Sequence, residues 1–326
     1  MDWISIIYQA LGEIISPTTA AYALATIGLG IHFGYTGLLN FGQAAFLLIG
    51  AYGYAIATLT FGAPLWAAVL TALLAAVVFA LLLGVPTLRL RADYLAIVTI
   101  AAAEVMRFVV TTTGLTDITG AANGLSGYKY TFEATNPIPP GTYGFGPWRM
   151  NEYDWWVRIV GWGLVALASV VVWLLMRSPW GRVVRGIRED EDAVRSLGKR
   201  VFAYKMQALV LGGVMGAVAG IIFILPRAVQ PANYGTQLTF FVWTIMLLGG
   251  AATIFGPILG SILFWVVLSL TQGLLYGAIE AGWLPFLTTT QAGQIRFIMV
   301  GLALMLLVIF RPQGILGNKK ELTFSA

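Results

Sequence analysis

Long apolar runs recur along the chain from Pro17 to Phe310, and they limit the fold more than any other feature of the sequence. Each run has about twenty residues, the length that a helix needs to cross the roughly 30 Å hydrocarbon core of a bilayer. Hydrophobic residues make up 59% of the chain and charged residues only 10%, which is more apolar surface than one soluble core encloses. The sequence therefore predicts an all-α integral membrane protein.

The runs predict a polytopic helical bundle of about nine transmembrane helices in a single domain, residues 1–326. Residues 1–16 are too short and too mixed to span, but Trp3, Ile4, Ile7 and Leu11 recur at helical spacing, which indicates a short N-terminal interfacial helix. Two spans after residue 236 lie so close together that either could be broken or re-entrant. The predicted spans are 17–36, 39–60, 64–84, 93–113, 155–176, 206–226, 237–255, 257–276 and 294–310.

Lysine and arginine residues gather in three segments that the predicted spans place on one side of the membrane. These segments are the loop with Arg89 and Arg91, residues 177–205, and the tail 311–326. Basic residues near span ends are retained in the cytoplasm, so both 177–205 and the C-terminus are predicted to be cytoplasmic. The loop 114–154 carries more acidic than basic residues and is predicted to be extracytoplasmic, as is the N-terminus.

The segment GRVVRGIREDEDAVRSLGKR, residues 181–200, is half charged in a chain with very little charge elsewhere. A helix from Ile187 to Gly198 would pair Arg188 with Asp192 and Glu191 with Arg195 at four-residue spacing. Its apolar residues would share another face, and Gly198 would end it. Anionic lipid would repel the acidic run, so mixed charge favours a protein partner over a solvated helix on the membrane surface. The apolar residues of that face are Ile187, Val194 and Leu197.

Several kinds of chemistry are excluded by composition. The chain has no cysteine and a single histidine, His32, so no thiolate or multi-histidine metal site is possible. The dipeptide Gly198-Lys199 is followed by Arg200 rather than Ser or Thr, so it is not a phosphate-binding loop. We therefore expect no catalytic, cofactor-binding or metal-binding residues, no enzymatic activity and no nucleic-acid partner. His32 is interpreted as a packing residue with satisfied hydrogen bonds.

Few polar groups lie within the predicted spans. Glu104 and Arg107 are three residues apart on one helix face, which indicates a structural ion pair, with a substrate contact as the alternative. Asn40 and Gln43 lie in the glycine-rich second span, and Asn123 lies in the outer loop. With Glu104, these three amides are the candidate residues of a substrate pathway, although each amide could equally cap a helix or bond a neighbouring one.

Four stretches carry a resemblance to a known family: 34–52 (GYTGLLNFGQAAFLLIGAY), 104–127, 180–220 and 296–317 (RFIMVGLALMLLVIFRPQGILG). They are spread in order over nearly the whole chain. In these stretches the sequence resembles the membrane permeases of branched-chain amino acid ABC importers, most closely the LivM type. Asp192, Ala193 and Gly198 also fit the spacing of the cytoplasmic loop through which ABC importers contact their ATPases, with Asp in place of Glu.

The resemblance implies a transmembrane permease subunit in the cytoplasmic (inner) membrane of a prokaryote. Its implied partners are a second permease chain, as a heterodimer with a LivH-type subunit, two cytoplasmic ABC ATPases and an extracytoplasmic binding protein. ATP and Mg would bind to the ATPases, so this chain itself would hold no cofactor. The segment 177–205 would then be a cytoplasmic coupling loop, and its expected coupling residues are Ile187, Arg188, Glu191, Asp192, Arg195 and Gly198.

The substrate implied by the resemblance is a branched-chain or other small neutral amino acid. A permease for urea or short amides from the same family is an alternative, because a pathway with few fixed charges suits either cargo. An ion-coupled secondary transporter is a second alternative, but ionisable groups at membrane depth are scarce for that mechanism.

Overall fold

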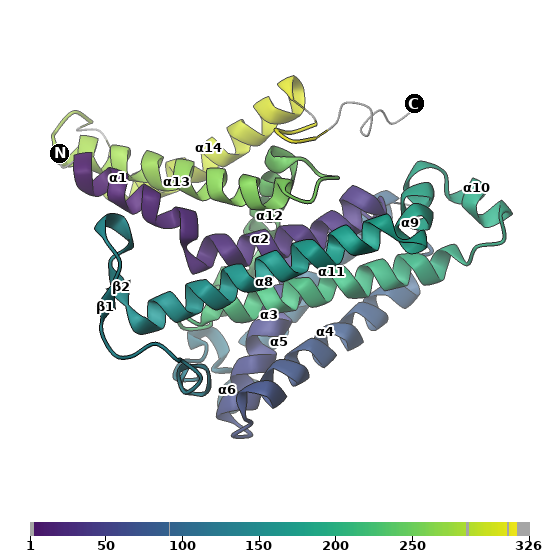
Figure 1. The fold of residues 1–326 in the computed structure, drawn as a ribbon, viewed down its shortest axis with the longest axis horizontal. Helices are drawn as coiled ribbons and strands as arrows, with labels where there is room; N and C mark the ends of the chain where they lie inside the picture. Colours follow the sequence, from purple (N-terminus) through teal and green to yellow (C-terminus); the bar gives the residue numbers. More distant parts are fainter. Residues whose placement is uncertain (1–2, 91, 285–286, 312, 318–326) are drawn as a thin grey trace.

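The fold is a bundle of helices, of which most long ones lie roughly along the long axis of the molecule and some cross it at a steep angle (Figure 1). The computed structural model describes residues 3–90, 92–284, 287–311 and 313–317. Each of the nine predicted spans coincides with a helix. The long helices are α1 (Trp3–Gly12), α2 (Pro17–Leu29), α3 (Gln43–Leu59), α4 (Leu65–Thr87), α5 (Ala92–Thr111), α8 (Glu152–Arg177), α11 (Val201–Ile224), α12 (Thr236–Gly249), α13 (Gly256–Glu280) and α14 (Thr289–Phe310).

Four helices form the centre of the bundle. α11 packs along α2, α3 and α4, and nearly every residue of α2 is buried. Small residues allow this, because a Cβ on Gly28 would lie 2.4 Å from the carbonyl oxygen of Gly212, and one on Gly220 would lie 2.0 Å from that of Leu47. Close approach of this kind stabilises helix pairs in lipid, where the hydrophobic effect between helices is absent.

Judged by helix length and composition, the number of membrane spans is smaller than the nine that the sequence predicts. Six of the described helices are long and apolar enough to cross a membrane, and a seventh arises if the pair 3–15 and 17–35, bent by 42°, forms one span. α3 and α12 are shorter apolar helices. The polytopic helical fold is confirmed, while the count of nine remains a prediction. α1 exposes Trp3, Ile4 and Ile7 along one side, and its interfacial position remains a prediction.

Two predicted span boundaries are wrong because the chain leaves the helix inside the bundle. After α2 the helix widens into the π-helical segment η2 (Gly30–Tyr35), and residues 36–42 are not helical. The predicted span 39–60 therefore begins only at Gln43. A second break separates α12 from α13, where Gly250 has φ of +117°. α12 is thus the shortened member of the pair that the sequence marked as broken or re-entrant.

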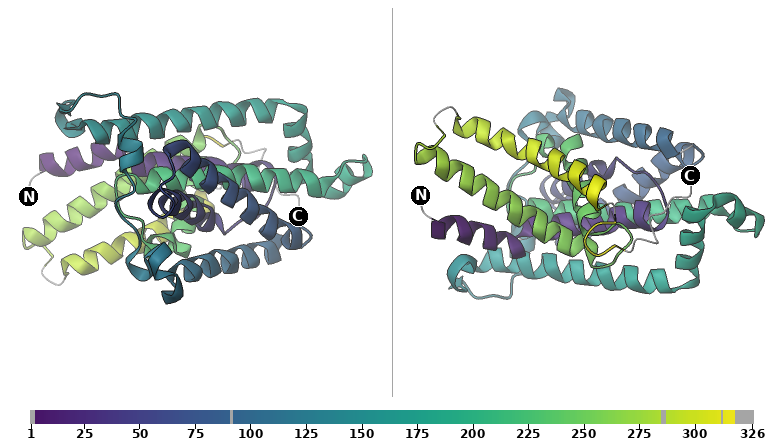
Figure 2. Two further views of the ribbon diagram at one scale, coloured as in Figure 1. Left: turned by 90° about the horizontal axis from the view of Figure 1, so that it is seen from below. Right: turned by 90° about the horizontal axis from the view of Figure 1, so that it is seen from above.

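The two ends of the bundle differ in charge and structure. One end carries the loop 114–154, with its short hairpin β1 (Thr142–Tyr143) and β2 (Met150–Asn151). The other carries the short helices α9 (Pro179–Glu189) and α10 (Glu191–Ser196), beyond the C-terminal end of α8 and the N-terminal end of α11 (Figures 1 and 2). The basic segment 177–205 and the loop 114–154 therefore lie at opposite ends, as the span assignment requires.

The close contact between α3 and α11 gives a test of the packing. A Cβ on Gly50 would lie 2.1 Å from the carbonyl oxygen of Ala217, whereas one on Gly163 would meet nothing within 4 Å. We expect Gly50→Ala to lower the free energy of unfolding by roughly 1–3 kcal/mol, because the backbones must separate. The matched change Gly163→Ala is expected to alter it by less than about 0.5 kcal/mol. Thermal unfolding midpoints in detergent measure both, and equal midpoints would contradict this packing.

Candidate functional site

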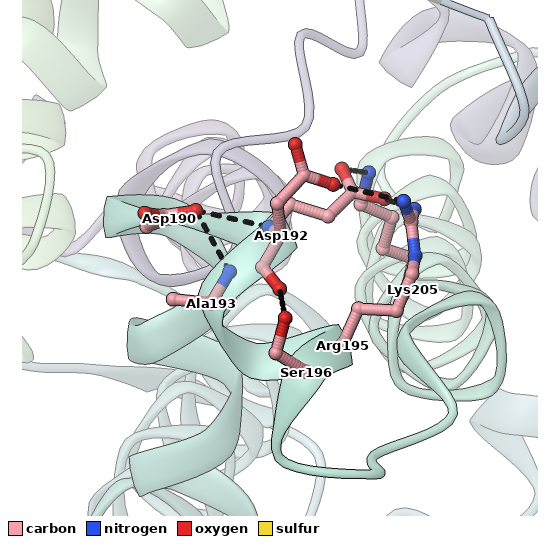
Figure 3. Close-up of polar contacts among 7 residues, drawn as sticks. Asp190, Asp192, Ala193, Arg195, Ser196 and Lys205 are labelled. Atoms are coloured by element: carbon pink, nitrogen blue, oxygen red, sulfur yellow. Dashed lines mark hydrogen bonds and ion pairs between the residues drawn. The ribbon is translucent and has the colours of Figure 1, made fainter.

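The charged segment forms two helices rather than the single helix predicted from Ile187 to Gly198. α9 ends at Glu189, and Asp190 adopts an extended conformation with φ of −153° and ψ of 104°. Its Oδ1 accepts hydrogen bonds from the backbone N–H groups of Asp192 and Ala193, both at 2.9 Å (Figure 3). Aspartate is a strong N-cap, so Asp190 starts a new helix, α10, and the prediction of a continuous helix is wrong.

The ion pairs of α10 are partly as predicted. Arg195 pairs with Glu191 at 2.9 Å and with Asp192 at 2.8 Å (Figure 3), which confirms the predicted pair of Glu191 with Arg195. Lys205 at the start of α11 also pairs with Glu191. The predicted pair between Arg188 and Asp192 is wrong, because the break at Asp190 separates them. Arg188 instead donates from Nη1 to the backbone carbonyl of Gly34, at 2.5 Å.

The apolar side of the segment is also divided by the break. Ile187 and Val194 are buried together with Val201, as the sequence predicts for the first two. Leu197 was predicted to share this face, and that prediction is wrong: α10 ends at Ser196, and the Leu197 side chain is 78% exposed. Gly198 follows with φ of +76°, which favours glycine. The tip of the segment therefore presents one exposed leucine beside charged groups.

A hollow of about 720 Å³ lies between α10 and the C-terminal end of α4. It combines an excess of basic side chains with two carboxylates, and its walls come from segments far apart in the chain. This end of the molecule thus offers a recess, mixed charge and an exposed apolar tip, which together suit a protein surface more than a lipid surface. The charged residues that line the recess are Arg89, Glu191, Asp192, Arg195, Lys199, Arg200 and Lys205.

A second polar region lies deep inside the bundle, where residues 36–42 leave the helix. Backbone groups in such a place need partners, because no water replaces them. The N–H of Phe41 donates to Thr99 Oγ1 on α5 at 3.0 Å. The N–H of Ala44, in the first turn of α3, donates to Thr239 Oγ1 on α12 at 3.1 Å. Side chains from two other helices therefore support the break and the start of α3.

Asn40, His32 and Gln43 form a buried network at this break, which we call the buried polar hub. Asn40 Nδ2 lies 3.0 Å from His32 Nδ1 and 3.3 Å from Gln43 Oε1. Because His32 Nε2 lies 3.1 Å from the carbonyl oxygen of Leu209, a proton on Nε2 leaves Nδ1 free to accept from Asn40. The expectation that His32 is a packing residue with satisfied hydrogen bonds is confirmed.

The contacts of Gln43 place the buried polar hub midway along α2 and α11. Its Nε2 donates to the carbonyl oxygen of Ala25, in the middle of α2, at 3.1 Å, and lies 3.5 Å from that of Gly212, in the middle of α11. Asn40 contributes its backbone as well, since its carbonyl accepts from Trp243 Nε1 at 3.2 Å. Asn40 and Gln43, two of the three candidate pathway amides, are thus buried and bonded to elements on several sides.

Glu104 joins α5 to the start of α12. It forms the predicted ion pair with Arg107, at 2.6 Å. Its second carboxylate oxygen accepts from the backbone N–H of Thr236 at 3.2 Å and from the Thr236 hydroxyl at 2.8 Å. A carboxylate in this position also complements the positive end of the α12 dipole. Both charged side chains remain about a quarter exposed, so the pair faces the surface of this chain rather than its core.

Asn123 lies away from the other candidates. It is an exposed residue of the loop 114–154 and follows Gly120, to whose carbonyl its N–H donates at 3.1 Å. The chain thus brings Asn40 and Gln43 together, while Glu104 and Asn123 occupy two other places. The sequence did not identify Thr99, Thr239 or Trp243 as hydrogen-bond partners of the break and of the first turn of α3. These three residues lie on other spans, and no sequence pattern around them indicates a bond to a distant segment.

Comparison with known proteins identifies the family. The family model described as branched-chain amino acid transport system / permease component matches residues 14–310. The chain belongs to this family, and the resemblance inferred from its sequence is confirmed.

Individual relatives agree with the family assignment. The permease protein LivM of the high-affinity branched-chain amino acid transport system of Escherichia coli (strain K12) is 32% identical over 313 residues, which cover 93% of this chain and 69% of LivM. A probable LivM of Methanocaldococcus jannaschii is 25% identical over 341 residues, covering 93% and 92%. The autoinducer 2 import system permease protein LsrC of Photorhabdus laumondii subsp. laumondii is 30% identical over 140 residues, covering 40% of this chain and 41% of LsrC.

The start of α3, next to the hub, gives a test that separates a hydrogen bond from packing. Thr239→Val keeps the shape of the side chain but removes the acceptor for the Ala44 N–H, and Thr239→Ser keeps the hydroxyl. We expect the valine variant to lose about 1–3 kcal/mol of stability, because a buried donor is left unpaired. The serine variant is expected to retain more of it. Unfolding midpoints that fall more for serine than for valine would show that the methyl group, not the hydrogen bond, matters here.

Proposed function

We propose that this chain is the transmembrane permease subunit of an ABC importer for branched-chain or other small neutral amino acids. Hydrolysis of ATP on separate cytoplasmic ATPase subunits would drive transport. Membership of the family, over residues 14–310, is the observation that carries the proposal. The sequence supports it further, because the chain has no phosphate-binding loop of its own.

The ATPases are proposed to act on α9, α10 and the recess beside them. Movement of these helices would reach the bundle through Arg188, which is bonded to the carbonyl of Gly34 at the inner end of η2. The same side chain packs on Gly37, where a Cβ would lie 3.3 Å from Arg188 Cγ. Residues 36–42 then lead directly to Asn40 and the buried polar hub. A displacement at the cytoplasmic end would thus be delivered to the start of α3.

The pathway residues are proposed to be Asn40, Gln43, Glu104 and Asn123. Breaks in helices expose groups that can hold a carboxylate or an ammonium, and Asn40 and Gln43 lie at such a break. The partly exposed pair of Glu104 and Arg107 supports a position at the border between this chain and a second permease chain. Asn123 lies on the outer loop, which we propose as the docking surface of an extracytoplasmic binding protein.

The proposed assembly also fixes the orientation of the chain. A LivH-type second permease chain, two cytoplasmic ATPases and one binding protein complete it. The basic end with α9 and α10 faces the cytoplasm together with the C-terminus, and the loop 114–154 faces outward with the N-terminus. The residues proposed to contact the ATPases are Ile187, Arg188, Glu191, Asp192, Arg195 and Gly198.

The energy source distinguishes this proposal from an ion-coupled transporter. We expect cells or proteoliposomes that contain the complete assembly to take up leucine only when ATP is supplied. Collapse of the ion gradients by an ionophore, with ATP held constant, is expected to leave initial uptake rates unchanged. Uptake that persists without ATP and stops with the ionophore would contradict the proposal.

Charge reversal tests the coupling residues. Asp192→Arg breaks the ion pair between Asp192 and Arg195, and Arg195→Asp breaks this pair and the pair with Glu191. The double variant restores opposite charges at positions 192 and 195, while Glu191 keeps its pair with Lys205. If the pair only stabilises α10, the double variant is expected to recover. If the charges face an ATPase, the double variant is expected to stay defective, with ATPase recovery in copurification lower by about tenfold, equivalent to about 1.4 kcal/mol.

The control for this experiment lies at the other end of the molecule. Asp117→Arg changes an exposed carboxylate of the loop 114–154 and is expected to leave ATPase copurification unchanged. Full copurification and full uptake in the double variant would refute a contact between these two side chains and the ATPase.

A further inference from the structure

A cavity of about 430 Å³ opens at the end of the bundle that carries the β hairpin, and none of the proposed pathway residues lines it. It lies among α2, α11, α12, α13 and α14, next to the 3-10 helix η6 (Pro231–Tyr234). Polar side chains line it near the outer ends of these elements, where Glu13, Thr18 and Asn233 lie on connecting segments or first turns. Aromatic side chains line it one or more turns deeper. The cavity is therefore polar at its mouth and aromatic below.

The cation at the mouth is held in place but is not neutralised. Arg227 Nη2 donates to Thr18 Oγ1 at 2.5 Å, and the guanidinium carbon lies 4.3 Å from the centroid of the Phe223 ring. In the described part of the chain, no carboxylate lies within ion-pair distance of Arg227. A guanidinium has five N–H donors in a planar fork that suits a carboxylate. Arg227 thus keeps donors for an anionic group in the cavity.

The deeper part of the cavity is an aromatic surface. The ring of Tyr22 lies 5.0 Å from that of Trp265, and the ring of Phe241 lies 6.1 Å from that of Phe297. Trp265 Nε1 is buried without a hydrogen-bond partner in the described structure. This surface suits an aliphatic group, because apolar burial against rings is favourable and the mouth supplies the polar contacts.

We propose that this cavity binds an amino acid with an apolar side chain as it arrives from the outside. Its carboxylate would bind Arg227, its ammonium would face Glu13, and its side chain would contact Tyr22, Phe241 and Trp265. The charges of Arg227 and Glu13 at the mouth of the cavity match the carboxylate and the ammonium of an amino acid, which are bonded to the same carbon. The inference rests on the proposed function and adds a binding site to it.

The position of the cavity supports transfer from it to the proposed pathway. Gln237, in the first turn of α12, lines the cavity. The residue before it, Thr236, holds the carboxylate of Glu104 on the other side of the same turn. The start of α12 therefore separates the cavity from the Glu104–Arg107 pair by a single turn of helix.

The experiment measures equilibrium binding to the complete complex in nanodiscs, without the binding protein. The ligands are leucine, 4-methylpentanoate, which lacks the ammonium, and isopentylamine, which lacks the carboxylate. The wild-type complex is expected to bind leucine more tightly than either analogue. Arg227→Gln is expected to weaken leucine by about tenfold, equivalent to about 1.4 kcal/mol, with little effect on isopentylamine. Glu13→Gln is expected to weaken leucine toward the affinity of 4-methylpentanoate.

The matched control variant is Arg149→Gln. It removes an exposed arginine that lies at the same end of the bundle as the cavity but does not line it, and it is expected to leave leucine binding unchanged. ATPase activity and size-exclusion profile show whether each variant complex is intact, and Glu13→Gln serves if Arg227→Gln does not assemble. Trp265→Ala is expected to weaken leucine but not glycine.

Three results would overturn the inference. They are absence of leucine binding to the intact wild-type complex, unchanged leucine affinity in both Arg227→Gln and Glu13→Gln, and a phospholipid that copurifies with the wild type, is lost in Arg227→Gln and is not displaced by leucine. ATP-dependent uptake by the wild type, measured in parallel, separates the two proposals. If uptake persists while binding fails these tests, the cavity site is wrong and the importer proposal stands; if uptake is independent of ATP, the importer proposal fails first.

Discussion

The structure depends on one constraint: backbone groups that leave a helix inside a membrane protein must find partners within the chain. Residues 36–42 leave the helix between α2 and α3, and their partners come from helices that are distant in sequence. Thr99 on α5, Thr239 on α12 and Trp243 on α12 each bond this break or the turn after it. The break therefore connects four helices, α2, α3, α5 and α12. A movement of any of them would displace the residues of the hub.

In the proposed importer, this arrangement would let an ATPase act on a chain whose sequence holds no phosphate-binding loop. α9 is bonded to the inner end of η2 through Arg188 and Gly34, and η2 runs directly into residues 36–42. α10 is fixed to α11 through Lys205 and Glu191. A partner that displaces α9 and α10 would act on two of the central helices at once, α2 and α11, rather than on a flexible loop. Small residues bring the backbones of those two helices into close contact, so a displacement of one would be transmitted to the other.

Sequence reasoning located the helices and the charged segment well because both signals are local. The length of an apolar run predicts a span directly. The pairs Glu191–Arg195 and Glu104–Arg107 follow from the spacing of their residues along one helix. The start of α3 was misplaced because its boundary is set by Thr99 and Thr239, far away in the sequence. The break at Asp190 was also missed, although its signal is local: an aspartate ahead of Glu191 and Asp192 is a typical N-cap. Arg227 was not predicted to be a site residue, because in the sequence a charge just beyond a span indicates only the orientation of the chain. Its contacts with Thr18 and Phe223 arise from the tertiary structure.

The most direct test of the account is a cross-link at the tip of the charged segment. The chain has no cysteine, so Leu197→Cys places a single thiol on an exposed side chain of α10's C-terminal end. In the assembled, ATP-hydrolysing complex, a short thiol–amine cross-linker is expected to join this position to an ATPase subunit, and Phe145→Cys, exposed at the opposite end, is expected not to do so. Equal ATPase cross-linking at both positions, or none at residue 197 in a complex that still imports, would contradict the claim that the ATPase acts on α9 and α10.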